Sequence, residues 1–298
     1  MLSLHTNLAA LMIENAMNRA SAAQKQSEIR LGTGYRINSA ADDAAGLQIS
    51  ARLDAQTSGM GVASQNTQDG ISLLQTADGA FEEMTKIVNR MKDLATQAAN
   101  DSNATVDKKA LQAEYDALGH ELYNEMQNTS YGGAQLFGAG ASGATLSGMF
   151  AGASGITFQI GATSAETMTV DLHSELAAIN NAFAANASGY SATGSASGSE
   201  ITTTSGANAM IDKLNGILDN IGSMRAGLGA AENRLTHTNN NLSNMSSNTT
   251  DATGRIKDTD YASEVTKNQQ ATTLVQSGQM MLKQANQMSQ SILALLQG

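Results

Sequence analysis

The chain contains no cysteine, no proline and no tryptophan among its 298 residues. Without cysteine it can form no disulfide bond, no Cys-ligated zinc site and no thiol nucleophile. An average chain of this length would carry roughly 15 prolines, and proline breaks helix interiors because it lacks an N–H donor and clashes with the preceding turn. A chain without proline is therefore able to form long, unbroken helices.

Aromatic residues are also scarce, at 4%, so a core must be built from Leu, Ile, Val, Ala and the 15 methionines. The formal net charge is −10, and it is concentrated in the middle of the chain, because both ends are nearly neutral. No basic patch stands out, which argues against a nucleic-acid partner. No stretch approaches the ~20 apolar residues that a membrane-spanning helix needs. The first residues also lack the basic segment of a cleaved signal peptide, so we expect no membrane insertion and either a cytoplasmic protein or one exported without such a signal.

Apolar periodicity predicts long helices over residues 3–31, 44–99, 106–129 and 207–253, with another helix in the C-terminal arm. The helix over 44–99 carries a seam whose gaps alternate between three and four residues, the spacing that keeps one stripe of a helix facing a partner. This seam consists of Leu74, Ala77, Phe81, Met84, Val88, Met91, Ala95 and Ala98.

Both ends of the chain carry similar stripes. The C-terminal one has the same alternating gaps and comprises Leu274, Gly278, Met281, Ala285, Met288, Ile292 and Leu295; the N-terminal one includes Leu4, Leu8 and Leu11. Termini are normally the frayed parts of a domain, and a single chain cannot bury both faces of two long terminal helices. We therefore predict that these stripes pack against other copies of the chain, with a purely intramolecular core as the alternative.

The middle of the chain departs from the helical pattern. Eight glycines fall between residues 132 and 155, where helix propensity is low. Alternating residues over 156–160 and 166–170 predict a β-hairpin near 156–172, and 173–186 is a candidate short helix. Residues 188–206 are rich in Ser, Thr and Gly, which predicts a surface loop that is also a candidate for O-linked sugar. The expected fold is mainly α, with long antiparallel helices, coiled-coil terminal arms and a small β-hairpin insert.

No motif in the sequence predicts an enzyme. Residues 138–143 match G-x-G-x-x-G, but they lie in a glycine run without the strand and helix that a dinucleotide site requires. No two of the four histidines have the i, i+4 spacing of a zinc site, and no nucleophile elbow marks a Ser-His-Asp set. Asp42 and Asp43 are adjacent and point to different faces, so we expect them to make polar contacts at a helix junction. We predict no catalytic residue, no metal and no cofactor.

Four motifs in chain order give the sequence a specific resemblance. Residues 29–50, 225–234, 255–265 and 284–287 resemble the characteristic segments of bacterial flagellin, and the resemblance covers roughly residues 1–140 and 205–298. Two features depart from the family pattern: the last helix lacks its usual proline, and the middle is short. The resemblance implies a filament subunit of the extracellular bacterial flagellum, used for swimming or swarming. It further implies an inner coiled-coil domain of residues 1–44 and 255–298, inside an outer domain of residues 45–187 and 207–254, with 188–206 as its loop.

The resemblance also implies partners. These are other copies of the chain, a flagellar export chaperone and a type III export apparatus, and the filament cap and hook-associated junction proteins. Host innate immune receptors are a further expectation, with Arg90, Leu94 and Glu114 at the matching contact positions and residues 29–50 matching the peptide that plants recognise. Two alternatives remain at this point: a hook–filament junction protein, and an enzyme displayed on a filament, for which the middle of the chain is small and poor in histidine.

Overall fold

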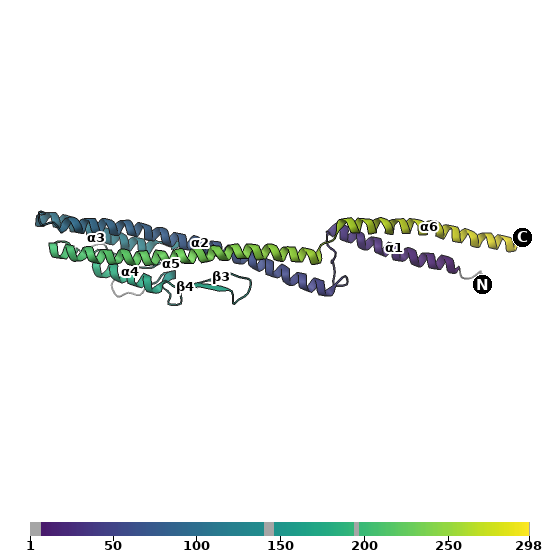
Figure 1. The fold of residues 1–298 in the computed structure, drawn as a ribbon, viewed down its shortest axis with the longest axis horizontal. Coiled ribbons are helices and arrows are strands. Elements are labelled where there is room, and N and C mark those ends of the chain that lie inside the picture. The colour runs from purple at the N-terminus through teal and green to yellow at the C-terminus, as the bar shows by residue number, and fades with distance from the viewer. Residues whose placement is uncertain (1–6, 140–145, 194–196, 298) are drawn as a thin grey trace. The chain divides into compact units, whose positions relative to one another are not determined.

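The computed structural model describes residues 7–139, 146–193 and 197–297, and the side chains of residues 289–297 fall outside the description. Helices dominate the described chain, which confirms the predicted mainly α fold with long antiparallel helices and a small β-hairpin insert (Figure 1). The helices are α1 (Leu8–Thr33), α2 (Ala44–Ala98), α3 (Thr105–Asn128), α4 (His173–Asn186), α5 (Thr204–Lys257) and α6 (Tyr261–Gln297). The contacts divide the chain into two compact units: unit 1 comprises residues 1–57 and 247–298, and unit 2 comprises residues 58–246.

The core of unit 2 is built on two long heptad seams. Every residue of the predicted α2 seam is buried, which confirms that prediction. The part of α5 in this unit supplies an opposing seam with the same alternation of three and four residues: Ala207, Met210, Leu214, Ile217, Ile221, Met224, Leu228, Ala231 and Leu235. Ion pairs and hydrogen bonds between the helices fix an antiparallel register, since Ser64 bonds Asn239 at 2.6 Å and Asp78 pairs with Arg225 at 2.7 Å.

Small β elements and the glycine-rich segment complete unit 2. The predicted hairpin is present as β3 (Ile156–Gln159) and β4 (Thr167–Val170), which pair antiparallel. A second hairpin, β1 (Ser130–Tyr131) and β2 (Ala134–Gln135), was not predicted. Its turn uses Gly132 and Gly133, both at positive φ, where a side chain would be strained. Beyond it, Phe137 lies 4.8 Å from the ring of Phe81, and the short 3-10 helix η1 (Met149–Ala151) brings Phe150 to 6.1 Å from Phe137.

Polar groups anchor the described residues of the 188–206 segment to α3, and α5 begins within this segment at Thr204. The Glu200 carboxylate accepts hydrogen bonds from the Ser188 backbone N–H and from Gln112 Nε2, at 2.7 and 2.6 Å. The hydrogen bonds hold the pKa of Glu200 below its usual range, although burial acts to raise it. Tyr190 and Ile201 from the same segment are buried in the core. This segment therefore carries both surface residues and core anchors.

Unit 1 is built on the antiparallel pair of α1 and α6. Asn7 caps α1 by accepting a hydrogen bond from the Ala10 backbone N–H at 3.1 Å. The helix ends at Gly34, whose φ of +77° is the left-handed conformation that favours glycine at a helix C-terminus. The register follows from Asn7 Nδ2, which donates to the Ala285 carbonyl at 3.3 Å, and from Ser27, which donates to Glu264 at 2.7 Å. Low residue numbers on α1 thus pair with high numbers on α6.

Candidate assembly surface

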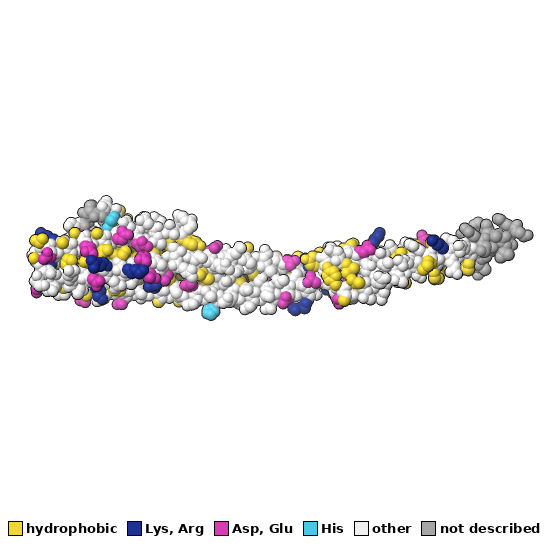
Figure 2. All heavy atoms as spheres, turned by 90° about the horizontal axis from the view of Figure 1, so that it is seen from above, with side chains coloured by type: hydrophobic (Ala, Val, Ile, Leu, Met, Phe, Trp, Pro, Cys, Tyr) yellow, Lys and Arg dark blue, Asp and Glu magenta, His cyan; other side chains and the backbone are white. Residues whose placement is uncertain are grey.

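Unit 1 has little core of its own. Among the described residues, only four of its hydrophobic side chains are buried: Ala20, Ile37, Ala271 and Ala285. Twelve of its large apolar side chains are instead exposed: Leu8, Leu11, Met12, Ile29, Tyr35, Ile49, Tyr261, Val265, Leu274, Met280, Met281 and Met288. Hydrophobic side chains form patches on the surface of this unit (Figure 2). Soluble monomers rarely leave so many large apolar side chains uncovered along the same helices, so this surface is a candidate interface.

The face of α6 that packs on α1 differs from the predicted stripe. The side chains turned toward α1 are the buried or half-buried Glu264, Asn268, Ala271, Val275, Gly278, Leu282 and Ala285, again with alternating gaps of four and three. Gly278 meets Met17 of α1, and a Cβ built at Gly278 would lie 3.5 Å from the Met17 Cβ. Small residues on this face let the two helices approach closely. The bulkier described members of the predicted stripe, Leu274, Met281 and Met288, consequently stay more than half exposed beside this contact.

The described residues predicted to pack the filament core are therefore exposed in the single chain. Leu8, Leu11, Leu274, Met281 and Met288 keep between 51% and 65% of their surface accessible. Leu4 lies outside the described residues, as do the side chains of Ile292 and Leu295.

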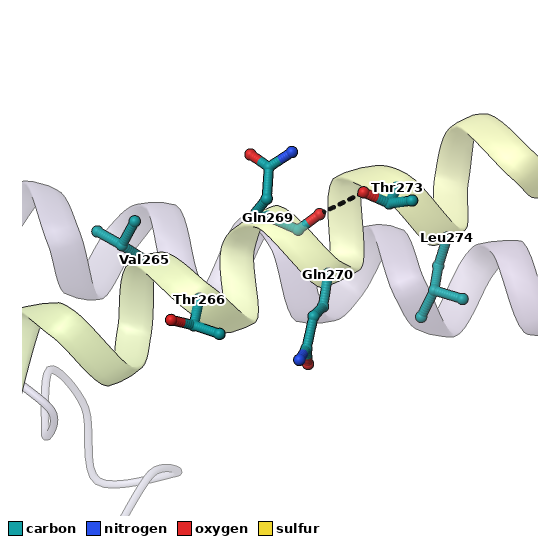
Figure 3. Close-up of a pocket in the computed structure, with 6 residues that line it drawn as sticks. All are labelled: Val265, Thr266, Gln269, Gln270, Thr273 and Leu274. Atoms are coloured by element: carbon teal, nitrogen blue, oxygen red, sulfur yellow. Dashed lines mark hydrogen bonds between the residues drawn. The ribbon is translucent and has the colours of Figure 1, made fainter.

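Two shallow hollows run along this surface. One lies between α1 and α6 and is lined by Ile13, Ala16, Met17, Leu274, Ser277, Gly278 and Met281. The other lies on α6 alone, where Val265, Thr266, Gln269, Gln270, Thr273 and Leu274 line it (Figure 3). In this second hollow the Thr273 hydroxyl donates a hydrogen bond to the Gln269 carbonyl of the same helix at 2.9 Å. The hydroxyl therefore has a partner within α6. Apolar side chains line a large part of both hollows, and in the second one the Thr266 hydroxyl also donates to its own helix, at the Ala262 carbonyl.

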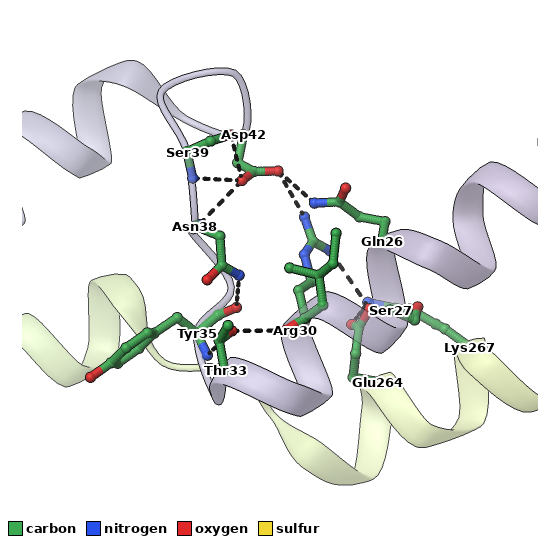
Figure 4. Close-up of polar contacts among 11 residues, drawn as sticks. Gln26, Ser27, Arg30, Thr33, Tyr35, Asn38, Ser39, Asp42, Glu264 and Lys267 are labelled. Carbon is green, nitrogen blue, oxygen red and sulfur yellow. Dashed lines mark hydrogen bonds and ion pairs between the residues drawn. The ribbon is translucent and has the colours of Figure 1, made fainter.

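A polar cluster holds the start of α6 against the end of α1 and the loop that follows (Figure 4). The Asp42 carboxylate accepts hydrogen bonds from Gln26 Nε2 at 2.6 Å and from the backbone N–H groups of Ser39 and Asn38 at 2.9 and 3.1 Å. The backbone hydrogen bonds from Ser39 and Asn38 hold the pKa of Asp42 below its usual range. Asp43 caps α2 by accepting from the Gly46 N–H at 2.9 Å, so the expected polar role of both aspartates at a helix junction is confirmed.

Glu264 is the buried carboxylate of this cluster. Only 3% of Glu264 is exposed, and its carboxylate accepts the Ser27 hydroxyl at 2.7 Å and pairs with Lys267 at 3.2 Å and Arg30 at 3.8 Å. Burial acts to raise the pKa of Glu264, but the hydrogen bond from Ser27 and the nearby cations outweigh it and hold the pKa below the usual range. Arg30 also reaches Asp42 at 4.0 Å, which links the two carboxylates through one guanidinium.

A short backbone bridge joins the segments of two of the resemblance motifs. The Arg36 N–H donates to the Lys257 carbonyl at 2.7 Å, and the Thr259 N–H donates to the Gly34 carbonyl at 2.9 Å. Lys257 Nζ lies 4.6 Å from the centre of the Tyr35 ring and 3.6 Å from Asp54. Sequence reasoning missed this junction and the Arg30–Glu264 pair. One feature of the sequence could have indicated the Arg30–Glu264 pair: Glu264 occupies a heptad position that is otherwise held by the small residues Ala271, Gly278 and Ala285.

The three residues predicted to meet an immune receptor occupy different environments. Arg90 and Glu114 are exposed and form an ion pair between α2 and α3, with the Arg90 Nη2 atom 2.6 Å from the Glu114 carboxylate. Leu94 is only 1% exposed, because it packs into the core of unit 2. Its side chain therefore offers no surface to a partner in this conformation. Acidic and basic side chains are intermixed on the face of unit 2 seen in Figure 2.

The described residues offer little to catalysis or to a membrane. They hold no cluster of three histidine or acidic side chains placed to bind a metal ion. No helix within the described ranges combines the length and the apolar character needed to cross a bilayer. Most of the G-x-G-x-x-G match, residues 140–143, lies outside the described residues.

Two family models match the chain, one at each end. Residues 4–141 match the bacterial flagellin N-terminal helical region, and residues 211–296 match the bacterial flagellin C-terminal helical region. The chain is 47% identical over 173 residues to polar flagellin F of Vibrio parahaemolyticus, and 45% identical over 170 residues to flagellin C of Vibrio cholerae. These alignments cover 58% and 57% of this chain but only 43% and 42% of the relatives' own lengths.

Solved structures similar to this one include a flagellin and a hook-associated protein. A crystal structure of Bacillus cereus flagellin is 31% identical, with a TM-score of 0.44, and the match covers 60% of this chain and 88% of that one. A putative flagellar hook-associated protein from Vibrio parahaemolyticus has a TM-score of 0.53 at 12% identity, over 73% of this chain and all of that one. At 12% identity, the similarity to the hook-associated protein concerns the fold alone.

Proposed function

The chain belongs to the bacterial flagellin family, and from this premise we propose that it polymerises with copies of itself into the helical flagellar filament that propels swimming or swarming cells. In this role it is a structural protein, secreted to the outside of the cell, and it needs no cofactor. The observation that carries the proposal is the concentration of uncovered apolar side chains on α1 and α6 of unit 1. Residues 1–44 and 255–298 would form the inner layer of the filament, and residues 45–254 the outer layer.

The energetics of burial favour such an assembly. Moving a Leu or Met side chain from full exposure to full burial contributes about 1.5–3 kcal/mol. Each copy holds several such side chains about half exposed, including Leu274, Met281 and Met288, so contacts with neighbouring copies add up along a lattice. Heterologous contacts that do not close into a ring generate a helical filament. A tube stabilised in this way can transmit torque delivered at its base.

The same uncovered surface creates a need for partners before assembly. We propose that an export chaperone covers the apolar face of α6 until the chain enters the flagellar export apparatus. At the two ends of the growing filament, the cap and the hook-associated junction proteins would supply the contacts that a neighbouring copy supplies elsewhere. Retention of the soluble chain by an immobilised export chaperone, and its loss on deletion of residues 255–298, is the measurement that checks the first of these partners.

The assembly proposal is tested by electron microscopy and sedimentation of the purified chain after seeding. We expect long uniform filaments from the intact chain and none from a chain lacking residues 255–298. The double variant Leu274→Gln/Met281→Gln should assemble at least about tenfold less well, since a loss of 1.4 kcal/mol per contact already corresponds to a factor of ten. Val106→Gln on α3 is the matched control, because Val106 is 76% exposed in unit 2.

Two results would contradict the assembly proposal. A chain that remains monomeric under every seeding condition supports the hook–filament junction protein instead. Filaments from the truncated chain would mean that the assembly surface lies outside unit 1.

We also propose that unit 2 presents a ligand surface to host innate immune receptors through Arg90 and Glu114. The exposure of both side chains supports this proposal, since Arg90 and Glu114 lie beside each other on the surface of α2 and α3, where a partner can reach both. A reporter-cell assay with Arg90→Ala and Glu114→Ala should show a reduced response. Unchanged potency of both variants, with normal folding by circular dichroism, would exclude these two residues.

A further inference from the structure

Most methionines in the described part of the chain fall into two groups by exposure, and Met17 of α1 lies between them as a half-buried residue. In unit 2, seven are buried to 4% or less: Met60, Met84, Met91, Met126, Met168, Met210 and Met224. In unit 1, four are between 54% and 66% exposed: Met12 on α1, and Met280, Met281 and Met288 on α6. Met149 and Met245 of unit 2 are intermediate, at 37%. The most accessible thioethers among the described residues therefore lie on the candidate assembly surface.

The composition makes these thioethers the principal target of an oxidant. The chain has no cysteine and no tryptophan, so neither a thiol nor an indole competes for it. Oxidation of methionine to the sulfoxide turns a flexible apolar side chain into a polar one, and it disrupts interfaces rich in methionine. Methionine sulfoxide reductases reverse the change.

We propose that Met12, Met280, Met281 and Met288 form an oxidation site at which peroxide controls assembly of the subunit. The proposal rests on the proposed function, because it assigns regulation to the same surface. In the step itself, a lone pair on the thioether sulfur attacks one oxygen of hydrogen peroxide, the O–O bond breaks and an S–O bond forms. The sulfur is oxidised by two electrons, and the peroxide is reduced to water, which carries both protons.

The surroundings of Met281 explain why the sulfoxide would oppose packing. Met281 lines the hollow between α1 and α6 beside Ile13, Ala16 and Leu274. These three side chains carry no hydrogen-bond donor, and the Ser277 hydroxyl is the one side-chain donor among the residues that line the hollow. Burying the sulfoxide oxygen against these apolar side chains and a second copy removes it from water, which is unfavourable unless a donor replaces the water. The same contact would shield the thioether once the filament has formed, so the soluble subunit is the sensitive state.

The first measurement is peptide mapping by mass spectrometry of the soluble chain treated with hydrogen peroxide. The four exposed methionines should be oxidised at least about tenfold faster than the seven buried ones, since susceptibility follows exposure. In preassembled filaments the four should be protected. Equal rates for the two groups in the soluble chain would overturn the proposal.

The second measurement is assembly after the same treatment. After seeding, the oxidised wild-type chain should form at least about tenfold less filament than the untreated chain, and reductase treatment should restore filament formation. A variant with Met12, Met280, Met281 and Met288 all changed to Leu conserves volume and should assemble both before and after peroxide. The control Met149→Leu/Met245→Leu should remain as sensitive as the wild-type chain.

The outcomes separate the two proposals. An untreated chain that does not assemble overturns the proposed function. An untreated chain that assembles, followed by an oxidised one that assembles equally well, overturns the oxidation proposal alone. The fourfold Leu variant could fail to assemble even without peroxide. In that case the reductase experiment on the oxidised wild-type chain tests the oxidation proposal: recovery of assembly supports it, and a permanent loss of assembly overturns it.

Discussion

At the scale of single residues, Glu264 and Asp42 illustrate what periodicity does not reveal. The sequence places Glu264 one heptad before Ala271, and the structure buries it against Ser27 and Arg30. Hydrophobic patterning predicts apolar residues at such positions, so a buried carboxylate is visible only once its three-dimensional partners are known. The polar role of Asp42 was predictable to a greater degree, because aspartate side chains commonly accept backbone hydrogen bonds in the turns between helices.

The pH dependence of the α1–α6 pair is the prediction at this scale. Both carboxylates have pKa values lowered in the folded chain, so each stabilises it fully above the unfolded-state pKa of about 4 and loses that contribution as pH falls through the lower folded value. We expect the protection of α1 and α6 peptides against hydrogen exchange to be constant from pH 8 to about 5. It should weaken below about pH 4.

The double variant Asp42→Asn/Glu264→Gln tests whether these two carboxylates cause the pH dependence. It should be less stable than the parent at pH 7, and its remaining stability should change less between pH 5 and 3. A parent and a variant with the same acid profile would show that other groups govern the acid response. Glu14→Gln, on an exposed part of α1, is the matched control.

At the scale of elements, the predictability of α2 and α6 differs for a physical reason. The α2 seam was predicted correctly because its partners lie within the same chain and bury the whole apolar stripe. On α6 the largest apolar residues were expected in one seam, but α1 packs on the smaller ones, around Gly278. A heptad pattern identifies an apolar face, but it does not specify which of two neighbouring faces meets which partner.

Two glycines in unit 1 should respond in opposite directions to alanine. Gly278 is helical, and a Cβ there would lie in ordinary contact, 3.5 Å from Met17; Gly278→Ala should therefore stabilise the pair by about 0.5–1 kcal/mol through helix propensity. Gly34 has φ +77°, and its Cβ would lie 3.3 Å from the Tyr261 hydroxyl; Gly34→Ala should cost about 1 kcal/mol or more. Urea unfolding monitored at α1 and α6 measures both. Stabilisation by Gly34→Ala would contradict the assigned helix end.

At the scale of the whole molecule, the two units differ in where their stability comes from. Unit 2 buries two opposing seams, a set of aromatic rings and the anchors of the 188–206 segment, and so contains its own core. Unit 1 buries four hydrophobic residues and exposes twelve large ones among those described. Composition and periodicity predicted the helices of both units. They could not predict how much of unit 1 stays uncovered, because exposure depends on packing that only the folded chain reveals.

The most direct test of this account is a structure of the assembled filament by electron cryomicroscopy. We expect Leu8, Leu11, Leu274, Met281 and Met288, which are at least half exposed in the single chain, to be buried against neighbouring copies in the filament. A filament in which these side chains remain exposed, with copies joined through unit 2 alone, would show that α1 and α6 do not carry the assembly surface.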